Sequence, residues 1–454
     1  MTDKSAMRVL LANHWHDDNR GDSAITQGIL TLLRERWPAA DVTITTLAED
    51  GELWRGCGRH LHGAFDDLTI TPSPAPTELR GHAGRRSTAK VATDTALLWL
   101  RTAPSFLSIA FGRPLRSWKK RVIDHDLVVL VGGSNIFDDA GVPAALGIPR
   151  LIGVLGAAYT AIRVGRPVLL LGHTLGPFDH WLGRRIAARM LRGTDLAVVR
   201  EAGSISVAEQ LGVRRVEEAP DMAFALTPAR TPRVAQMLRQ LPADPSRTLV
   251  LSVRQHPTHT GTHDDRLVVE FADAARQLIA DGDVDGVAVV AHTTGPTPIE
   301  DDRPVSVLLA KALHDVPVTL IDDDATPAEL SAFYGEMAAV VAVRLHAAIL
   351  ALNAGTPTFA VSYLTAKTQG VMTQVGLPDA VAEFRTVSAR QIAQGVRRLL
   401  ASSELQAGLT SRALERRIEM VEAAARWFDV SDPAASSSAA GQLAEQARRT
   451  GAGR

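Results

Sequence analysis

Residues 340–367 read VVAVRLHAAILALNAGTPTFAVSYLTAK, and this stretch decides the fold. The apolar residues at 340–343 predict a strand buried on both faces, because parallel strands covered by helices show no polar alternation. The helical pattern that follows ends at Gly355 and Pro357, and the apolar run at 358–361 predicts a second buried strand. A strand, a helix and a strand in this order indicate a parallel α/β sheet.

Charged and polar side chains stand where these two predicted strands end. Arg344 and His346 follow the first strand, and Tyr363 and Lys367 follow the second. In an open parallel sheet this edge faces the ligand crevice, and the first turn of the next helix adds unpaired N–H groups. The pattern therefore predicts an anion site. For Arg344 and His346 taken alone, a salt bridge and a helix cap are the structural alternative.

The same placement recurs along the chain. Two adjacent glycines let a ligand approach the backbone closely, and a guanidinium group suits a carboxylate or a phosphate. Five further apolar runs are followed by glycine, arginine or histidine: Gly132 and Gly133 after 127–131, His173 after 168–171, Arg200 after 196–199, Arg254 after 249–253, and His292 after 287–291. We expect these residues to meet at the facing edges of two sheets.

The N-terminal segment predicts a strand at 8–12, a polar loop and an amphipathic helix at 23–36. The loop lacks the G-x-G-x-x-G pattern of dinucleotide sites, which argues against an NAD enzyme. Asn19, Gly21 and Asp22 stand in the loop directly before the helix. Helix capping and a tight turn explain these residue types as well as ligand binding does.

Composition limits the kind of protein. The 454 residues suffice for two domains, each with its own core. There are 49 Lys and Arg against 50 Asp and Glu, so no overall field attracts nucleic acid or an acidic membrane. A single cysteine, Cys57, fits a reducing compartment. Without a signal-peptide core or a run approaching the ~20 apolar residues of a membrane span, we expect a cytoplasmic protein.

Proline and charge are concentrated at 227–247, which predicts a linker between a domain at 1–226 and a domain at 248–430. Repeated strand-then-helix units on both sides predict an α/β protein with two Rossmann-like, doubly wound domains that face each other across a cleft. Residues 431–454 are rich in Ala, Ser and Gly and predict a flexible tail with little core to bury.

Residues 96–121 combine six basic residues with several aromatic residues and contain no acid. Such a segment fits docking on anionic lipid headgroups or on a lipid-linked sugar. A partly buried helix pair, interrupted at Pro104 and Pro114, explains the same pattern, because aromatic stripes usually face a core. The aromatic residues are Trp99, Phe106, Phe111 and Trp118.

Three histidines, His256, His259 and His263, lie close together in the sequence. No cysteine accompanies them, and the intervening proline and glycine argue against a helix that would align them. We therefore predict no metal site.

Several motifs resemble those of the polysaccharide pyruvyl transferase family. The run Arg344-Leu345-His346-Ala347, followed by a small-residue helix, a Gly-x-Pro turn, Tyr363 and Lys367, resembles the late motif of that family. The residues that resemble its other motifs are Asn19, Gly21 and Asp22 at the start, Arg200-Glu201 with Ser204 (Glu replaces the family's Asp), and Asp221 with Ala223-Phe224. Ser134 stands where the family usually has a third glycine.

The resemblance implies two Rossmann-like domains arranged as in B-type glycosyltransferases. It also implies transfer of the enolpyruvyl group of phosphoenolpyruvate to a sugar of a polysaccharide or lipid-linked precursor, with formation of a pyruvate ketal and release of phosphate. We expect Arg200 and Arg344 to hold the donor, His346 to transfer a proton and His173 to share that work. The residues expected to bind substrate are Asn19, Gly21, Asp22, Gly132, Gly133, Arg254, His292, Tyr363 and Lys367.

Guanidinium groups can neutralise the departing phosphate, so this reaction requires no metal or cofactor. The partners we expect are the donor, a saccharide acceptor and, at the inner face of the membrane, peripheral lipid contact, but no nucleic acid. Two alternatives share the fold and the cationic site. One is a B-type glycosyltransferase that uses a nucleotide sugar, and the other is a non-catalytic sugar-phosphate binding protein.

Overall fold

The computed structural model describes residues 6–75, 88–141, 143–254, 265–363 and 365–429. Two sets of residues named above, the predicted tail at 431–454 and the histidines His256, His259 and His263, lie outside this part of the chain.

The N-terminal domain is built on a seven-stranded parallel sheet with the order β3-β2-β1-β4-β5-β6-β7. The order reverses between β1 and β4, which is where doubly wound sheets open a crevice at the carboxyl ends of their strands. The strands are β1 (Arg8–His14), β2 (Asp41–Thr46), β3 (Leu68–Thr71), β4 (Leu127–Asp138), β5 (Val168–Phe178), β6 (Leu196–Val199) and β7 (Val216–Glu218).

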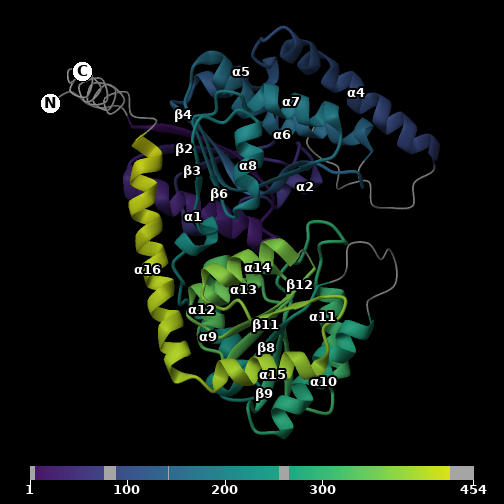
Figure 1. Cartoon of the computed structure of the whole chain (residues 1–454), viewed down its shortest axis with the longest axis vertical. Helices are drawn as coiled ribbons and strands as arrows, with labels where there is room; N and C mark the ends of the chain where they lie inside the picture. Colours follow the sequence, from purple (N-terminus) through teal and green to yellow (C-terminus); the bar gives the residue numbers. More distant parts are fainter. Residues whose placement is uncertain (1–5, 76–87, 142, 255–264, 364, 430–454) are drawn as a thin grey trace, which may run out of the picture.

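The C-terminal domain has a six-stranded parallel sheet with the order β10-β9-β8-β11-β12-β13. Its strands are β8 (Thr248–Ser252), β9 (Gly286–Val290), β10 (Val318–Ile321), β11 (Ala339–Ala342), β12 (Thr358–Ser362) and β13 (Val381–Glu383). The stretch at 340–367 supplies β11, the helix α13 (Leu345–Asn353) and β12, so the strand-helix-strand prediction is confirmed. Figure 1 shows the two domains stacked along the long axis of the molecule.

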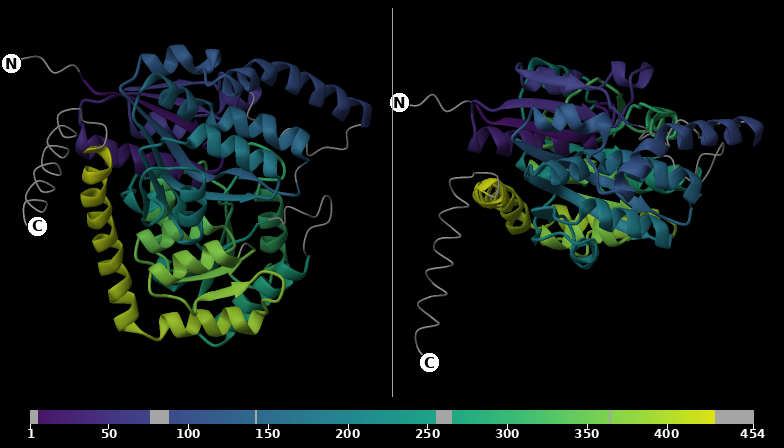
Figure 2. Two further views of the ribbon diagram at one scale, coloured as in Figure 1. Left: turned by 45° about the horizontal axis from the view of Figure 1, so that its top comes forward. Right: turned by 90° about the horizontal axis from the view of Figure 1, so that it is seen from above.

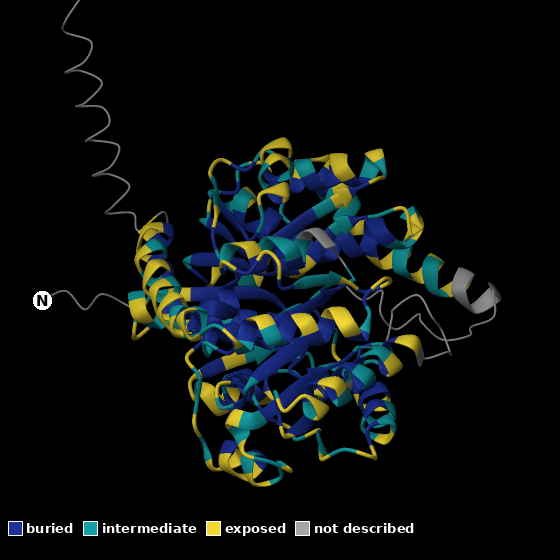
Figure 3. Cartoon of the chain, turned by 60° about the horizontal axis from the view of Figure 1, so that its bottom comes forward, coloured by how far each residue is buried: buried dark blue, intermediate teal, exposed yellow. Residues whose placement is uncertain are grey.

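Helices cover both sheets, and the strands between them are buried, as Figure 3 shows in dark blue. The helices of the first domain are α1 (Arg20–Arg36), α2 (Glu52–Arg55), α3 (Arg59–Ala64), α4 (Thr88–Ala110), α5 (Arg116–Ile123), α6 (Ala144–Val164), α7 (Trp181–Leu191), α8 (Gly203–Gln210) and the 3₁₀ helix η2 (Met222–Ala225). Those of the second are α9 (Pro232–Arg239), η3 (Pro245–Arg247), α10 (Asp265–Ala280), α11 (Arg303–Ala312), α12 (Pro327–Tyr334), α13, α14 (Thr365–Gln374) and α15 (Ala389–Leu400).

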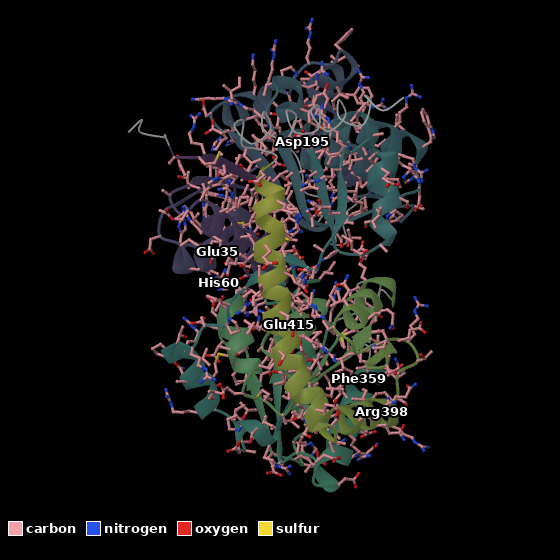
Figure 4. The ribbon with its side chains drawn as sticks, turned by 60° about the vertical axis from the view of Figure 1, so that its left-hand side comes forward. Glu35, His60, Asp195, Phe359, Arg398 and Glu415 are labelled. Atoms are coloured by element: carbon pink, nitrogen blue, oxygen red, sulfur yellow. The ribbon has the colours of Figure 1, made fainter. Side chains whose placement is uncertain are left out.

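The last helix, α16 (Ser403–Phe428), runs back from the second domain along the first, as Figures 1 and 4 show from two sides. Its end is fixed there: the indole Nε1 of Trp427 donates to Glu217 Oε2 at 2.8 Å, and the rings of Phe428 and Trp37 lie 5.2 Å apart. Buried apolar residues continue from α1 and η2 into the second domain. One edge of the domain interface is therefore closed by packing.

Two strands extend beyond the ends that the sequence predicted. β4 and β5 were expected to end at residues 131 and 171, but they continue as far as Asp138 and Phe178. Within this extension Gly133 pairs with His173. The prediction that His173 stands at a strand's carboxyl end was therefore wrong, because the two extended strands satisfy each other's backbone groups beyond the apolar runs.

The predicted linker at 227–247 contains a helix. Thr231 caps α9 by accepting from the backbone N–H of Val234, and its hydroxyl donates to Glu329 of α12 at 2.7 Å. α9 thus packs against the second domain.

The basic, aromatic segment at 96–121 forms parts of α4 and α5, as the helix-pair alternative predicted. Only one of its two prolines interrupts it: Pro114 lies between the helices, whereas Pro104 lies inside α4. Ile109 and Trp118 are buried on the inner side.

Among the described helices, α6 is long and apolar enough to cross a membrane by length and composition. The expectation that no run approaches this length was therefore wrong for Ala144–Val164. In the fold, however, 83% of the apolar 18-residue stretch of this helix is buried. It packs as a core helix against α7 and β4.

Candidate active site

A cavity of about 190 Å³ lies between the carboxyl edges of the two sheets. Both domains contribute to its wall. Residues that follow the strands of the two domains therefore lie close together, as the sequence predicted. All the predicted site residues except Gly21 and His173 line it: Asn19, Asp22, Gly132, Gly133, Arg200, Arg254, His292, Arg344, His346, Tyr363 and Lys367.

Each of the three guanidinium nitrogens of Arg200 donates a hydrogen bond within the protein. Nη1 donates to Asp221 Oδ2 at 2.6 Å, Nε donates to Thr174 Oγ1 at 2.9 Å, and Nη2 donates to Ser134 Oγ at 2.9 Å. Burial raises the pKa of Asp221, but Arg200, His346 and the N–H of Ala223 together outweigh burial and hold the pKa of this carboxyl well below its usual range. Arg200 and Asp221 therefore form a buried ion pair at the cavity wall.

His346 lies across the domain interface from the same carboxylate. Its Nε2 is buried and stands 3.6 Å from Asp221 Oδ2, while Asp221 also accepts from the backbone N–H of Ala223 at 3.0 Å. The ring packs against Gly21, where an added Cβ would approach Nδ1 to 2.3 Å. Gly21 thus supports the imidazole without lining the cavity. A carboxylate that faces one ring nitrogen fixes the orientation of the other.

Arg344 has a carboxylate partner of its own. Its Nε and Nη2 form a two-point pair with Asp302, at 2.9 Å to Oδ2 and 2.7 Å to Oδ1, and Nη2 also donates to the carbonyl of Glu300 at 2.7 Å. Burial lowers the pKa of Arg344, but Asp302 raises it more. Its Nη1 makes no hydrogen bond within the described part of the chain and remains open to a ligand. Both roles predicted for Arg344 therefore have support.

Among the described residues, neither Arg254 nor Lys367 forms a direct ion pair with a carboxylate, although Asp302 and Glu300 act on Arg254, and Glu201 acts on Lys367, from farther away. The guanidinium carbon of Arg254 lies 4.4 Å from the ring centre of Tyr363, and its buried Nε makes no hydrogen bond there. Burial and the nearby charge of Arg344 lower the pKa of Arg254. Lys367 Nζ donates to Ser134 Oγ at 2.8 Å, and burial, followed by Arg200, lowers its pKa to about 8. Within the described residues, these two side chains are the cavity's cations that no direct ion pair neutralises.

The other two histidines are held neutral. His292 lines the cavity, with Nδ1 at 3.4 Å from the Tyr334 hydroxyl, and burial followed by the charge of Arg344 holds its pKa well below the usual value. His173 is fully buried outside the cavity wall, its Nε2 is 3.1 Å from the Leu130 carbonyl, and burial lowers its pKa to about 4. The structure therefore does not bring His173 to a position from which it could share proton transfer.

Backbone and helix-cap groups form the remaining wall. Asn19 caps α1 by accepting from the N–H of Asp22, and its backbone bridges to Thr293 of the second domain. A Cβ at Gly132 would lie 2.3 Å from two carbonyl oxygens of β5, and Gly133 has a φ of 131°. Only glycine fits at these two positions.

Three acidic residues of the site were not assigned from the sequence: Asp221, Glu300 and Asp302. Asp221 had a signal, because its motif resembled that of the family. Glu300 and Asp302 had none, since they lie in an irregular segment between β9 and α11. Within the described residues, no three His, Cys, Asp or Glu side chains are grouped so that they could hold a metal ion.

Comparisons with known proteins agree with the motifs. Residues 19–365 match the family model described as polysaccharide pyruvyl transferase. The chain is 26% identical over 427 residues to the amylovoran biosynthesis protein AmsJ of Erwinia amylovora, and the match covers 90% of this chain and 96% of that protein.

Solved structures are similar in fold. The UDP-GlcNAc 2-epimerase of Neisseria meningitidis bound to UDP-GlcNAc has a TM-score of 0.52 and 12% identity, covering 91% of this chain and 100% of that one. TcCGT1 in complex with UDP has a TM-score of 0.55 and 10% identity, covering 94% and 100%. The predicted arrangement of two Rossmann-like domains, as in B-type glycosyltransferases, is confirmed.

Proposed function

Because the chain belongs to the polysaccharide pyruvyl transferase family, we propose that it transfers the enolpyruvyl group of phosphoenolpyruvate to a sugar of a polysaccharide or lipid-linked precursor, forming a pyruvate ketal and releasing phosphate. The relative AmsJ is an amylovoran biosynthesis protein, and this similarity supports a polysaccharide pathway. A saccharide acceptor and a cytoplasmic location are part of this proposal. The observation that carries it is the cavity's two cations, Arg254 and Lys367, which form no direct ion pair in the described residues and lie with an imidazole that faces a buried carboxylate.

The donor has a carboxylate and a phosphate, and it needs two cationic contacts. Arg254 and Lys367 supply them, with the open Nη1 of Arg344 as a third. Arg200 is occupied by Asp221, Thr174 and Ser134, so its part is to position Ser134 and the carboxylate rather than to clamp the donor. In this proposal Arg254 and Lys367 are the main donor contacts, whereas the sequence predicted that Arg200 and Arg344 hold the donor.

The reaction then follows from the position of His346. A sugar hydroxyl attacks the central carbon of phosphoenolpyruvate and forms a C–O bond, while protonated His346 gives its proton to the methylene carbon. A dianionic donor beside the ring stabilises the protonated imidazole, and Asp221 holds it in place. The imidazole, now neutral, takes up the proton of the attacking hydroxyl. A second sugar hydroxyl displaces phosphate, and its proton leaves with the phosphate as the ketal closes. The cations near the leaving group stabilise its charge.

The size of the cavity favours this donor over a nucleotide sugar. Its volume of about 190 Å³ lies below the roughly 300–1,000 Å³ that drug-sized ligands occupy. Phosphoenolpyruvate is small enough for such a space. Thermal shift distinguishes the candidates, because a ligand that binds only the folded state raises the melting temperature. We expect phosphoenolpyruvate to stabilise the protein at concentrations where UDP-sugars do not. The reverse ranking would favour the glycosyltransferase alternative.

We expect Gly21→Ala to lower turnover at least tenfold with little loss of fold stability. The new methyl group would meet Nδ1 of His346 at 2.3 Å and push the imidazole away from Asp221. Gly63→Ala is the matched control, because a Cβ there has no heavy atom within 4 Å. Steady-state kinetics and melting temperatures of both variants test this. Equal turnover in the two variants would mean that His346 has no part in the reaction.

Lys367 should make donor affinity depend on pH. Its pKa of about 8 in the folded protein is below the usual 10.5, so above pH 8 the unliganded lysine loses the charge that the donor needs. The donor phosphate is already fully ionised there. Affinity should be constant below pH 8 and fall up to about tenfold per unit above it. Calorimetry from pH 7 to 10 measures this, and Lys367→Arg should give a flat profile. If donor affinity in that variant still fell with pH as in the wild type, a group other than Lys367 would be responsible.

A further inference from the structure

A second cavity, of about 530 Å³, lies between α6 and α7 of the N-terminal domain and shares no residue with the active-site cavity. Four arginines dominate its wall, together with Tyr159 and Gly112. The arginines are Arg163, Arg185, Arg189 and Arg192. Among the described residues, no Asp or Glu lines it. A cavity with this lining has a strongly positive local potential although the net charge of the whole chain is −1.

Most of this positive charge has no partner. Within the described residues, the side chains of Arg163, Arg185 and Arg192 form no ion pair or hydrogen bond. Tyr159 is 2% exposed, and its hydroxyl, which lies at the cavity wall, also has no hydrogen-bond partner there. A buried hydroxyl and three free guanidinium groups form a donor-rich site, and such a site suits a phosphate group.

Exposed apolar side chains adjoin this pocket. Arg189 donates from Nε to the carbonyl of Ile109 at 2.7 Å and from Nη2 to that of Ala110 at 3.0 Å, which ties the pocket to the end of α4. Figure 2 shows α4 projecting from the body of the domain in both views. Its outward residues are 56–73% exposed: Leu97, Leu100 and Leu107, with Phe111 directly after the helix.

Further basic residues lie near Phe111, at the C-terminal end of α4. The guanidinium group of Arg113 lies 6.0 Å from the ring of Phe111, and Arg113 and Arg116 line a third cavity with Leu107 and Phe111. No acidic residue occurs from 95 to 123 or within α7. Bare apolar residues bordered by basic ones are typical of surfaces that enter the boundary between lipid headgroups and acyl chains.

We propose that this face docks the protein on an anionic membrane, with a lipid phosphate in the arginine pocket and Leu107 and Phe111 in the apolar boundary. A soluble phosphate would fill the pocket but leave the apolar side chains in water. A neutral bilayer would cover the apolar side chains but would gain little from four arginines. An anionic lipid surface matches both features.

Co-sedimentation with vesicles tests the proposal without donor or acceptor, so the result is independent of pyruvyl transfer. We expect the full chain to bind vesicles that contain phosphatidylglycerol and phosphatidylcholine, but not phosphatidylcholine alone. Binding should be lost in 1 M salt, where charges are screened beyond about 3 Å. Equal binding to both vesicle types, or no binding to either at low salt, would overturn the proposal. Inorganic phosphate that raises the melting temperature without vesicle binding would show a site for soluble anions instead.

Two pairs of matched variants locate the surface. Arg185→Gln with Arg192→Gln should weaken vesicle binding at least tenfold, since each basic side chain near an anionic surface contributes about 1 kcal/mol. Arg390→Gln with Arg398→Gln removes two exposed arginines from α15 as the control. Leu107→Ser with Phe111→Ser should also weaken binding, unlike Leu414→Ser with Ile418→Ser on α16. Melting temperatures check that every variant folds, and equal losses in test and control pairs would contradict the assignment.

Discussion

His346→Gln is expected to reduce saturated turnover at least 100-fold while the dissociation constant of phosphoenolpyruvate changes only a fewfold. A positioned general acid contributes about 10²–10⁴ in rate, and this contribution belongs to the transition state rather than to donor binding. Glutamine keeps a polar side chain of similar reach but carries no transferable proton. The ring's contacts with Asp221 and Gly21 fix it without the donor, so its loss should not reshape the cavity.

The competing role for His346 makes the opposite prediction. If the imidazole only holds the donor's phosphate, then donor affinity weakens and turnover at saturation survives. Single-turnover kinetics measures the rate at saturation, and calorimetry measures the donor affinity separately. His62→Gln, at an exposed position on α3, is the control for loss of an imidazole elsewhere. Unchanged saturated turnover in His346→Gln would end the claim that this residue transfers a proton.

Arg254→Gln is expected to raise the donor's dissociation constant roughly 10- to 100-fold, because hydrogen bonds to charged groups contribute about 1.5–3 kcal/mol. Its effect on stability should be small, since no carboxylate in the described part of the chain is left without a partner. Arg344→Gln is the informative contrast. It would leave Asp302 buried and unpaired, which typically costs about 3–5 kcal/mol, so its melting temperature should fall by several degrees.

These two variants also decide which arginine binds the donor. For each variant, isothermal titration with phosphoenolpyruvate gives the dissociation constant of the donor, and thermal unfolding gives the melting temperature. A loss of affinity confined to Arg344→Gln, with Arg254→Gln behaving like wild type, would return donor binding to the pair of arginines favoured by sequence. A loss of stability in Arg254→Gln would reveal that its charge is compensated in the folded protein.

The fold was predictable because its strands are continuous apolar runs. β8, β9 and β11 lie within a residue or so of the predicted ranges, since a strand buried on both faces admits few polar residues. The extensions of β4 and β5 were not predictable in the same way, because their glycine and polar residues resemble a loop. The error about His173 follows directly from those extensions.

The site was predictable as a set of strand-end cations but not as a set of pairs. Which carboxylate faces Arg344 depends on how the segment between β9 and α11 returns to the cavity, and Asp302 is 42 positions away in the chain. Asp221 and His346 meet only because the two domains close on each other. Pairing across such separations is a tertiary property, and single-sequence patterns do not encode it locally.

The return of α16 to the N-terminal domain has a consequence for how the chain is made. Ribosomes synthesise proteins from the N-terminus, so the first domain can fold long before Trp427 and Phe428 emerge. Until then Trp37 lacks the ring it packs against, and Glu217 lacks its indole donor. A polypeptide cut short before the last helix would keep this surface bare. The surface of the first domain is therefore completed only after α16 has been made, and chains truncated before it are left with an exposed aromatic residue for chaperones and proteases to find.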